Sequence, residues 1–572
     1  MPPAVTPTGH AAEYDRSGTT RDLAAPASAQ SAVERALRSP RALLALVLVG
    51  VALRCWQLLA GISLWLDETL LARNILELPL RTLLTEPLAI DQVAPRGFLL
   101  AEKLAVLAFG PHDWALRLFP FAVGLATLPL FRRLAERTLD GLAVPFAVAA
   151  FAIGVPFIRY TIEVKQYGAD IFATVALLLL ALDLRDRDRS AAGLVGAALA
   201  GAGLLLFSQA AALVATGVGA ALAVLWLRDR DTRTRRALVG VVPVWAIAVL
   251  AAVVAGERSM TPSTRAFMQD FWRPGFLPLP FDLARGARWF GGALLDPFGD
   301  PWLLRYPVPL AALALAVLGV LTLARHRPAV ALLVLAPVFV TLGAAVAQRY
   351  PFRTRLVLFL LPLAVLMLSA GAEWLRRLGA RRDPRLGGAL MVGALALPLW
   401  ALVDARMPVV AERNREVAAY IARHRQPGDA IYLLQLASYP FMYYAPRFGI
   451  APHEWTPGTC DRFDTRAFVR QLDEFRGRRR VWVVLSGQRP LRTARAAIRR
   501  YVQTIGVPLD SLTLRSAVFA PTLVELYDLG DPARLARASA ETIPVDPMPT
   551  DPRPGCRRFG ASPLEELRAR AR

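Results

Sequence analysis

Two adjacent acids, Asp67 and Glu68, follow the first long apolar stretch of the chain, in the segment LWLDE at residues 64–68. A charge at the bilayer centre is costly, so we expect both acids at a membrane–water boundary, facing protein or a water-filled cavity. A carboxylate placed there can take a proton from an attacking hydroxyl group. The plainer interpretation is an acidic N-cap of an interfacial helix, since acids favour a helix N-terminus.

Polar residues also gather in two short segments that the apolar pattern places on the same membrane face. Residues 159–167 supply Glu163, Lys165, Gln166 and Tyr167, and residues 349–355 supply Arg353 and Arg355. Arginine binds phosphate bidentately and stays charged, so acids and arginines at one surface suit a lipid-phosphate substrate. Two plainer interpretations stay open: an interfacial ion pair between Glu163 and Lys165, and binding of anionic head groups by the two arginines.

The elements that must position these residues are apolar helices. The chain has 572 residues, is 55% hydrophobic and has a mean hydropathy of +0.40. A spanning helix needs about 20 apolar residues, and the sequence predicts about eleven of them. They cover residues 42–60, 114–131, 143–158, 168–183, 191–207, 210–227, 237–255, 307–324, 329–347, 356–372 and 386–404.

Basic residues between these stretches predict the topology. They cluster before the first stretch and on alternate loops, near residues 132–137, 185–189, 228–236, 325–327 and 376–385. Because positive residues favour the cytoplasmic side, we expect the N-terminus inside and the C-terminal part outside. This pattern also explains the net charge of +22 without a nucleic-acid partner. The basic segment 349–355 breaks the rule and is therefore a candidate functional site.

The remaining segments complete the predicted organisation. Residues 1–38 read as a disordered cytoplasmic tail, and residues 97–110 as an amphipathic helix lying in the interface. Arg54, inside the first span, either snorkels outward or contacts a phosphate. The Trp and Phe residues of the long loop 256–306 read as an interfacial belt or as a platform that stacks on a sugar.

A change of character near residue 405 predicts a separate α/β domain over residues 405–572. Strands are expected at 430–436, 480–485 and 523–529, and helices at 411–425 and 491–504. Cys460 and Cys556 fall in this domain, and we expect a disulfide between them, with two unpaired thiols as the alternative.

At this point the sequence resembles a known family. The segments that carry the likeness are SLWLDE, QVAPRGFLLAEKLAVLAFG, LRLFPFAVG, YTIEVKQYGADIF and YPFRTRLVLFLLPL. Together they resemble the bacterial GT-C membrane glycosyltransferases related to protein O-mannosyltransferases and the lipid A aminoarabinose transferase. The likeness covers residues 42–185, continues around 348–371 and is weak in the C-terminal domain. It implies a polyprenyl-phosphate sugar donor and an extracytoplasmic active site.

The resemblance also implies roles for particular residues. Asp67 matches the first-loop acid that acts as base or binds the acceptor, and Glu163 matches the second-loop acid. The chain departs from the pattern at residues 92–95, Gln-Val-Ala-Pro, where relatives often have His-Pro-Pro. That departure weakens a metal assignment, although a divalent metal stays possible. His112 is a candidate ligand, but a histidine on a loop surface is the plainer interpretation.

We therefore expect a mainly α, polytopic helix bundle over residues 39–404, with an extracytoplasmic α/β domain, in the bacterial cytoplasmic membrane. The expected activity is inverting transfer of a sugar from a polyprenyl-phosphate donor to a hydroxyl group of a lipid, glycan or protein. The alternative is a transporter or flippase of lipid-linked glycans, for which polar or broken helices at mid-membrane would be typical. The expected catalytic residues are Asp67, Glu68 and Glu163, and the expected substrate-binding residues are Arg54, Lys165, Gln166, Tyr167, Arg353 and Arg355.

Overall fold

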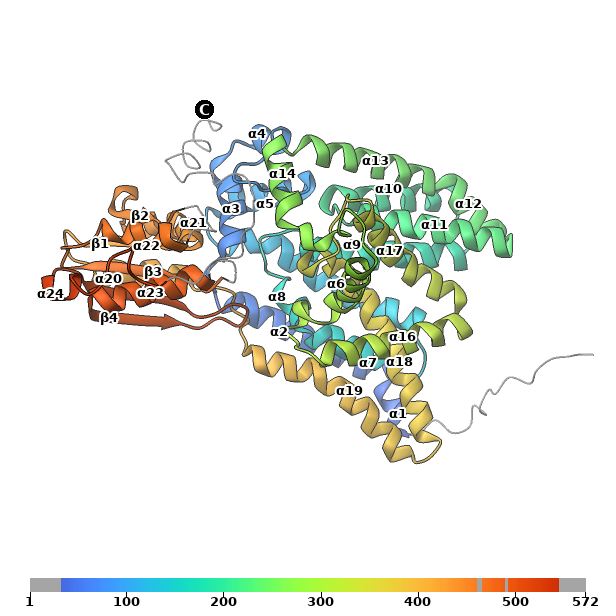
Figure 1. Ribbon diagram of the computed structural model, residues 1–572. Helices are drawn as coiled ribbons and strands as arrows, with labels where there is room; N and C mark the ends of the chain where they lie inside the picture. The colour runs from blue at the N-terminus through green and yellow to red at the C-terminus, as the bar shows by residue number, and fades with distance from the viewer. Residues whose placement is uncertain (1–31, 460–464, 489–491, 545–572) are drawn as a thin grey trace, which may run out of the picture.

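The computed structural model describes residues 32–459, 465–488 and 492–544. In these residues a long bundle of helices carries a smaller α/β domain at one end, which we call the domain end of the bundle (Figure 1). This architecture confirms the mainly α fold class with a C-terminal α/β domain. Residues 1–31, 460–464, 489–491 and 545–572 are not described, so the predicted disulfide between Cys460 and Cys556 lies outside the described residues.

Each of the predicted apolar stretches is helical, although the stretch 143–158 breaks at Gly154 into α7 (Ala143–Ile153) and α8 (Val155–Arg159). In the described part of the chain, nine helices are long and apolar enough to cross a membrane, and two are shorter. The long ones are Pro40–Leu59 (α2), Ala115–Thr138 (η1 and α6), Tyr167–Asp186 (α9), Ala211–Asp229 (α11), Thr232–Arg258 (α12 and α13), Val308–His326 (α16), Pro328–Val346 (α17), Thr354–Ala380 (η5 and α18) and Pro384–Ala405 (α19). The shorter ones are Ala143–Ile153 (α7) and Ala191–Phe207 (α10). The chain is thus a multi-pass membrane protein.

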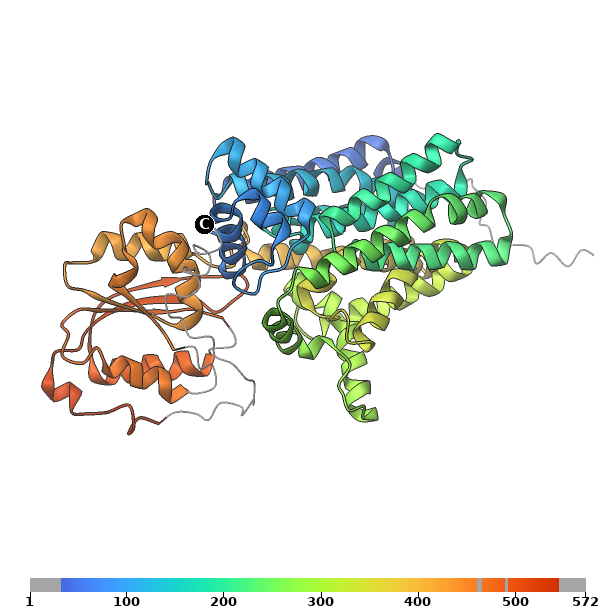
Figure 2. The same cartoon turned by 90° about the horizontal axis from the view of Figure 1, so that it is seen from above.

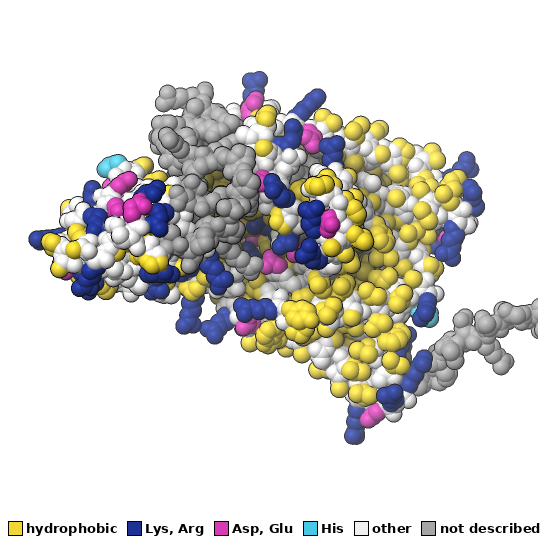
Figure 3. All heavy atoms as spheres, viewed as in Figure 1, with side chains coloured by type: hydrophobic (Ala, Val, Ile, Leu, Met, Phe, Trp, Pro, Cys, Tyr) yellow, Lys and Arg dark blue, Asp and Glu magenta, His cyan; other side chains and the backbone are white. Residues whose placement is uncertain are grey.

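Helix α18 lies at the centre of the bundle. Its most apolar window is 89% buried, against 17% for the matching windows of α13 and α19. Gly319 of α16 and Gly371 of α18 lie where the two helices touch, and a Cβ at either would meet backbone of the other helix within 2.0 Å. Small residues at such a contact let helix backbones approach closely. The outer helices instead expose a continuous apolar surface (Figure 3).

Three short helices fill the domain end between α2 and α6. They are α3 (Leu66–Glu77), α4 (Leu80–Thr85) and α5 (Arg96–Phe109). Helix α3 packs against α21 (Gln435–Tyr444) of the C-terminal domain, as Figure 1 shows. Helix α5 buries its charged pair Glu102 and Lys103 in the protein and exposes Leu104 and Leu107. Its apolar face therefore points outward, as the predicted interfacial helix requires.

The C-terminal domain is built on one mixed sheet in the order β2-β1-β3-β5-β4. The strands are β1 (Ala430–Leu433), β2 (Trp455–Pro457), β3 (Val481–Leu485), β4 (Val507–Leu514) and β5 (Thr522–Asp528). Strands β2, β1 and β3 run parallel, whereas β5 is antiparallel to both β3 and β4. Helices α20 (Asn414–His424), α22 (Thr465–Asp473) and α23 (Arg492–Ile505) complete the domain (Figure 2).

The structure differs from the predictions in three places. Residues 32–37 form helix α1 within the tail expected to be disordered, and its Glu34 pairs with Arg376 at 2.9 Å. The strand expected at 430–436 ends at Leu433, because Gln435 begins helix α21. Strands β2 and β4 and helices α21 and α22 were not predicted, since short or half-exposed elements carry weak periodicity.

The side chain of Arg54 also lies elsewhere than predicted, because it is buried in the protein and does not snorkel outward. Its side chain is 1% exposed, and its guanidinium donates to the carbonyls of Phe151 and Ala152 at the end of α7. Pro156 follows this helix break and has no N–H for the carbonyl of Ala152 four residues earlier. Arg54 supplies the missing donors, so its contacts are structural.

Candidate functional site

The start of α3 separates the two adjacent acids. The Glu68 carboxylate folds back to accept a hydrogen bond from the N–H of Trp65 at 3.0 Å, which caps the helix. Adjacent helical residues point about 100° apart, so Asp67 faces a different side. The plain N-cap interpretation therefore holds for Glu68, while Asp67 is available for other contacts.

Asp67 lies between two cationic side chains from distant parts of the chain. Its Oδ1 is 3.2 Å from Lys165 Nζ, and its Oδ2 is 3.0 Å from Arg355 Nη2. Burial alone would raise the pKa of Asp67, but the charges of Lys165 and Arg355 outweigh burial and hold that pKa below its usual value. The carboxylate is thus ionised and bound by side chains alone.

Lys165 connects this ion pair to the segment in which the chain departs from its relatives. Its Nζ donates to Gln92 Oε1 at 2.6 Å, and both side chains are buried. The predicted site did not include Gln92, although its place in the departing segment 92–95 was a signal that could have found it.

Arg355 enters the site from the start of the central helix segment. Its guanidinium lies over the rings of Trp65 and Trp272, at 5.3 and 5.1 Å from their centroids. Its Nε is buried and has no acceptor among the described residues. Trp272 comes from the long loop 256–306, so at least one aromatic residue of that loop reaches the site rather than serving only as an interfacial belt.

Glu163 lies beside this ion pair, close to the charges of Arg159 and Glu68 as well as those of Arg355 and Asp67. Its side chain is 3% exposed, its Oε2 is 3.7 Å from Arg159 Nε, and its Oε1 has no hydrogen-bond partner in the described structure. Burial raises the pKa of Glu163 to about 7, with the nearby charge of Glu68 adding to the shift and that of Arg159 opposing it. The alternative left open from the sequence, an ion pair between Glu163 and Lys165, is not formed, because Glu163 faces Arg159 and Lys165 faces Asp67.

The other predicted residues lie near this centre in different ways. Gln166 has a buried Oε1 without a partner in the described residues, and the Tyr167 ring packs edge-on against Tyr160. Arg353 is exposed on the turn before Arg355, where the neighbouring Thr354 N–H is bound by Asp296. We call Asp67, Gln92, Glu163, Lys165 and Arg355 the ion-pair site.

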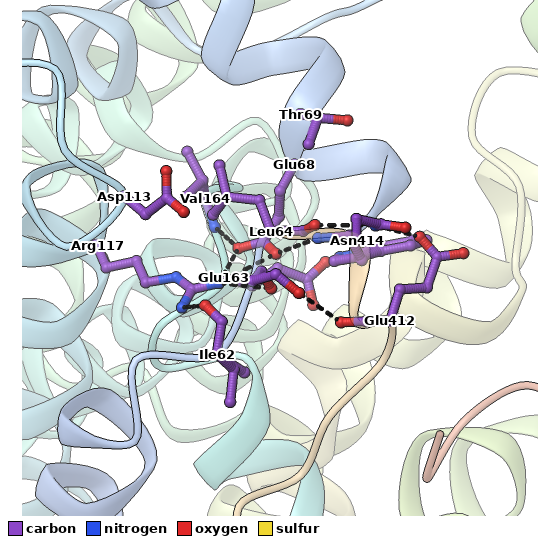
Figure 4. A network of polar contacts seen from close by, with 12 residues as sticks. Ile62, Leu64, Glu68, Thr69, Asp113, Arg117, Glu163, Val164, Glu412 and Asn414 are labelled. Carbon is purple, nitrogen blue, oxygen red and sulfur yellow. Dashed lines mark hydrogen bonds and ion pairs between the residues drawn. The ribbon is translucent and has the colours of Figure 1, made fainter. Parts of the chain in front are cut away.

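Glu68 belongs to a second group of contacts. Its Oε1 accepts from the Val164 N–H at 2.9 Å, and Arg117 Nη2 lies 3.4 Å from the carboxylate (Figure 4). Arg117 also donates to the carbonyls of Ile62 and Ser63. One buried carboxylate thus ties together α3, the 159–167 segment and the start of α6.

The C-terminal domain and its linker contact the backbone at residues 64–66, just before and at the start of α3. Glu412 Oε2 accepts from the Leu66 N–H at 2.9 Å, and Asn414 Nδ2 donates both to Glu412 and to the Leu64 carbonyl. The Tyr444 hydroxyl accepts from the Leu64 N–H at 2.7 Å. We call Glu68, Arg117, Glu412, Asn414 and Tyr444 the clasp, several members of which appear in Figure 4.

The residues of the ion-pair site do not fit a divalent metal. Each oxygen of Asp67 already faces a cation, and Gln92 and Lys165 occupy the space beside it. Within the described ranges, no three His, Cys, Asp or Glu side chains come together as a ligand set. His112 stacks on Trp114 and lines a cavity whose lining includes neither Asp67 nor Glu163.

Comparison with known proteins finds similarity at the level of solved structures. No family model and no curated protein matches the chain. It is similar to ArnT from Cupriavidus metallidurans bound to undecaprenyl phosphate, with 14% identity, a TM-score of 0.43, and coverage of 84% of this chain and 97% of that chain. It is also similar to the oligosaccharyltransferase AglB from Archaeoglobus fulgidus in complex with an inhibitory peptide and a dolichol-phosphate, with 12% identity, a TM-score of 0.46, and coverage of 82% and 72%.

A structure of an oligosaccharyltransferase from Archaeoglobus fulgidus in complex with Zn and sulfate is similar too, with 12% identity, a TM-score of 0.45, and coverage of 84% of this chain and 72% of that chain. Identities and TM-scores this low transfer no donor, acceptor, metal or residue role to this chain.

Proposed function

We propose that the chain is a membrane glycosyltransferase that moves a sugar from a polyprenyl-phosphate donor to an acceptor hydroxyl group. The observation that carries the proposal is the pairing of one carboxylate, Asp67, with two cations, Lys165 and Arg355, at 3.2 and 3.0 Å; cations of this kind bind phosphate. A base and a phosphate site are the two parts that such a transfer needs. Lipid, glycan or protein acceptors all offer the required hydroxyl group.

The ion pairs give the donor a way to activate the base. The donor phosphate is itself an anion, so it competes with Asp67 for Lys165 and Arg355. As these cations turn toward the phosphate, Asp67 loses the charges that lower its pKa and becomes a better proton acceptor. The base is thereby released only when a donor is bound.

The transfer step then follows from this arrangement. Asp67 takes the proton of the acceptor hydroxyl, whose oxygen attacks the anomeric carbon opposite the phosphate. The new C–O bond forms as the bond between the anomeric carbon and the phosphate oxygen breaks, and that oxygen leaves with the electron pair. Because the attack comes from the side opposite the phosphate, the anomeric centre is inverted. Lys165 and Arg355, with Arg353 at the exposed edge, stabilise the charge that develops on the departing polyprenyl phosphate.

Glu163, Gln166 and Tyr167 are proposed to orient the acceptor or the sugar. Glu163 is also the second candidate for the base, because a pKa of about 7 is well matched to proton transfer near neutral pH. The activity of Asp67→Asn and Glu163→Gln as a function of pH separates the two assignments. Only the residue that acts as base removes the acidic limb of the profile when it is replaced.

Glu68 and Arg54 are proposed to position the site rather than to contact substrate. The carboxylate oxygens of Glu68 accept from two backbone N–H groups and pair with Arg117. Arg54 donates to a backbone carbonyl at the end of α7. This differs from the catalytic role expected for Glu68 and the substrate-binding role expected for Arg54.

The proposed setting is the bacterial cytoplasmic membrane, with the N-terminus inside and the C-terminal domain and the ion-pair site outside. The alternation of basic loops supports this orientation. A reporter that is active only in the cytoplasm, fused after Arg572, should give no signal. A strong signal would place the C-terminal domain inside and reverse the topology.

The direct test uses the purified chain in lipid vesicles with a polyprenyl-phosphate lipid fraction from bacterial membranes. Mass spectrometry should find the sugar-bearing lipids converted to free polyprenyl phosphate, together with a glycosylated acceptor. A transporter would instead move these lipids across the bilayer and leave their masses unchanged. Sugar lipids that stay intact in the presence of every acceptor fraction would remove the transferase proposal.

A further inference from the structure

A cavity of about 260 Å³ lies at the domain end of α2, separate from the ion-pair site. Its apolar wall includes Leu58 and Ile62, at and just beyond the end of α2, and Trp114 before α6. Its polar wall includes Arg117 and two arginines of the C-terminal domain, Arg415 and Arg447. Three separate parts of the chain therefore meet around one hollow.

Asp113, which also lines the cavity, is fully bound by its neighbours. It accepts from Arg415 at 2.6 Å, from Arg447 at 2.8 Å, and from the hydroxyls of Tyr444 and Tyr443 at 2.7 and 3.1 Å. Burial alone would raise the pKa of Asp113, but the charge of Arg447 and these hydrogen bonds hold it below its usual value. The carboxylate is therefore ionised.

The charges around the cavity do not cancel. Arg117, Arg415 and Arg447 face only two carboxylates of the described chain, Asp113 and Glu68. One positive charge is left over, which an anion of single charge would neutralise. An arginine guanidinium offers five donors in a planar fork and suits a phosphate group.

The arginines keep donors available for such an anion. The side chains of Arg415 and Arg447 are 37% and 35% exposed, so their ion pairs with Asp113 leave part of each guanidinium open. Arg117 is only 2% exposed, and its Nε has no acceptor within the described structure. Arg117 therefore adds positive charge to the wall of the cavity, whereas the exposed guanidinium groups of Arg415 and Arg447 can contact a ligand directly.

The surroundings of the cavity match a lipid rather than a soluble ion. Leu59, the last residue of α2, is 82% exposed, and Leu107 and Phe109 of the neighbouring α5 are 65% and 52% exposed. Trp114 is 48% exposed, and tryptophan is enriched at membrane–water interfaces. Apolar chains have a surface here directly beside the arginines.

We propose that this cavity binds the phosphate head group of an anionic phospholipid of the surrounding bilayer. The head group contacts Arg415 and Arg447, and the acyl chains run along the exposed ends of α2 and α5. Such a lipid joins the end of the first span to the C-terminal domain. The inference is independent of the proposed sugar transfer, because it involves no residue of the ion-pair site.

The test is native mass spectrometry of the purified full chain titrated with phosphatidylglycerol, with phosphatidylcholine of matched chains, and with inorganic phosphate alone. One phosphatidylglycerol should bind per chain, about tenfold more tightly than phosphatidylcholine, which corresponds to one charge-assisted hydrogen bond. Equal binding of the two lipids would overturn the proposal. Displacement of the lipid by inorganic phosphate at equal concentration would assign the cavity to a soluble anion and also overturn it.

Two matched pairs of variants locate the site. Leu58→Trp fills the cavity without touching an ion pair and should abolish the tight binding, whereas Leu59→Trp, one residue further, should not. Arg415→Gln should weaken binding about tenfold, and Arg423→Gln, exposed on the same helix, should leave it unchanged. Each variant is first checked for an unchanged melting profile. Equal lipid binding by all four folded variants would show that the lipid lies elsewhere.

Discussion

The ion-pair site and the clasp are separated by a single residue step in the chain, yet they hold their acids in different ways. In the ion-pair site, the partners of Asp67 among the described residues are the long, flexible side chains of Lys165 and Arg355. In the clasp, Glu68 accepts from the backbone N–H groups of Trp65 and Val164 as well as from Arg117. Side-chain cations can change partner when an anion arrives, whereas backbone donors are fixed by the fold.

This difference teaches how a pair of adjacent acids can divide two tasks. The residue step on a helix turns the two carboxylates toward different surroundings. One side faces exchangeable partners and suits chemistry, and the other side faces fixed partners and suits positioning. The predictions below test that division, beginning with the change expected to have the largest effect.

Replacing the exchangeable acid should abolish most of the activity. Asp67→Asn keeps the size of the side chain and removes the base, so turnover of a polyprenyl-phosphate sugar should fall about a hundredfold or more. The amount of folded protein should not change. Turnover close to that of the wild type would mean that Asp67, like Glu68, serves only the structure.

The two arginines of the 349–355 segment should differ in the same assay. Arg355→Lys keeps the charge but loses the bidentate fork, so turnover should fall about tenfold if the guanidinium holds the donor phosphate. Arg353 is exposed and at the edge, so Arg353→Lys should have a smaller effect. Wild-type turnover in both lysine variants would remove the phosphate-binding role and leave general attraction of anionic lipids.

The clasp should affect the site through position alone. Glu412→Gln weakens the charge-assisted hydrogen bond to the Leu66 N–H, which is worth about 2 kcal/mol. We expect kcat to fall severalfold with an unchanged KM for the donor, because Asp67 is displaced while the cations remain. The matched control is Glu416→Gln, whose carboxylate pairs with Arg413 near the surface. Equal kcat and KM values for the two variants would show that the contact between Glu412 and Leu66 does not affect catalysis.

The smallest effect concerns the pH dependence of stability at Glu163. Its pKa is raised to about 7 in the folded chain, so the folded state binds more protons than the unfolded state above the ordinary carboxyl range. The wild type should therefore lose stability as pH rises from about 5 through about 7. Glu163→Gln removes that titration. The melting temperature of the variant, relative to that of the wild type, should therefore increase as pH rises over this interval. A constant difference between the two melting curves would mean that the pKa of Glu163 is not raised.

Much of the bundle could be predicted from the sequence, because long apolar stretches and basic loops depend on local composition. Each predicted span has a matching helix, and the acids and the Arg355 segment were expected at one face. Contacts between distant segments could not be predicted in this way. The partners of Lys165, the ring of Trp272 over Arg355, and the hold of Glu412 on Leu66 all depend on how separate elements meet.

The different roles of neighbouring residues also could not be predicted from the sequence. Asp67 and Glu68 look equivalent in the segment LWLDE, and only the helix start that turns Glu68 back to Trp65 distinguishes them. Arg54 looked like a snorkelling residue because the helix break at Pro156, which needs its donors, lies far away in the chain. Short elements of the C-terminal domain were missed for lack of periodicity.

The central claim is that Asp67 does chemistry while Glu68 holds the structure, and one paired measurement tests it most directly. Turnover of the polyprenyl-phosphate sugar and melting temperature are measured on the wild type, Asp67→Asn and Glu68→Gln. Asp67→Asn should lose about a hundredfold or more in turnover per folded molecule, whatever stability it loses with its ion pairs to Lys165 and Arg355. Glu68→Gln should lose about 3 kcal/mol of stability, since Arg117 stays buried without its carboxylate, and its turnover per folded molecule should fall no more than severalfold, as for the other clasp variant. Loss of turnover in folded Glu68→Gln together with an active Asp67→Asn would contradict the account.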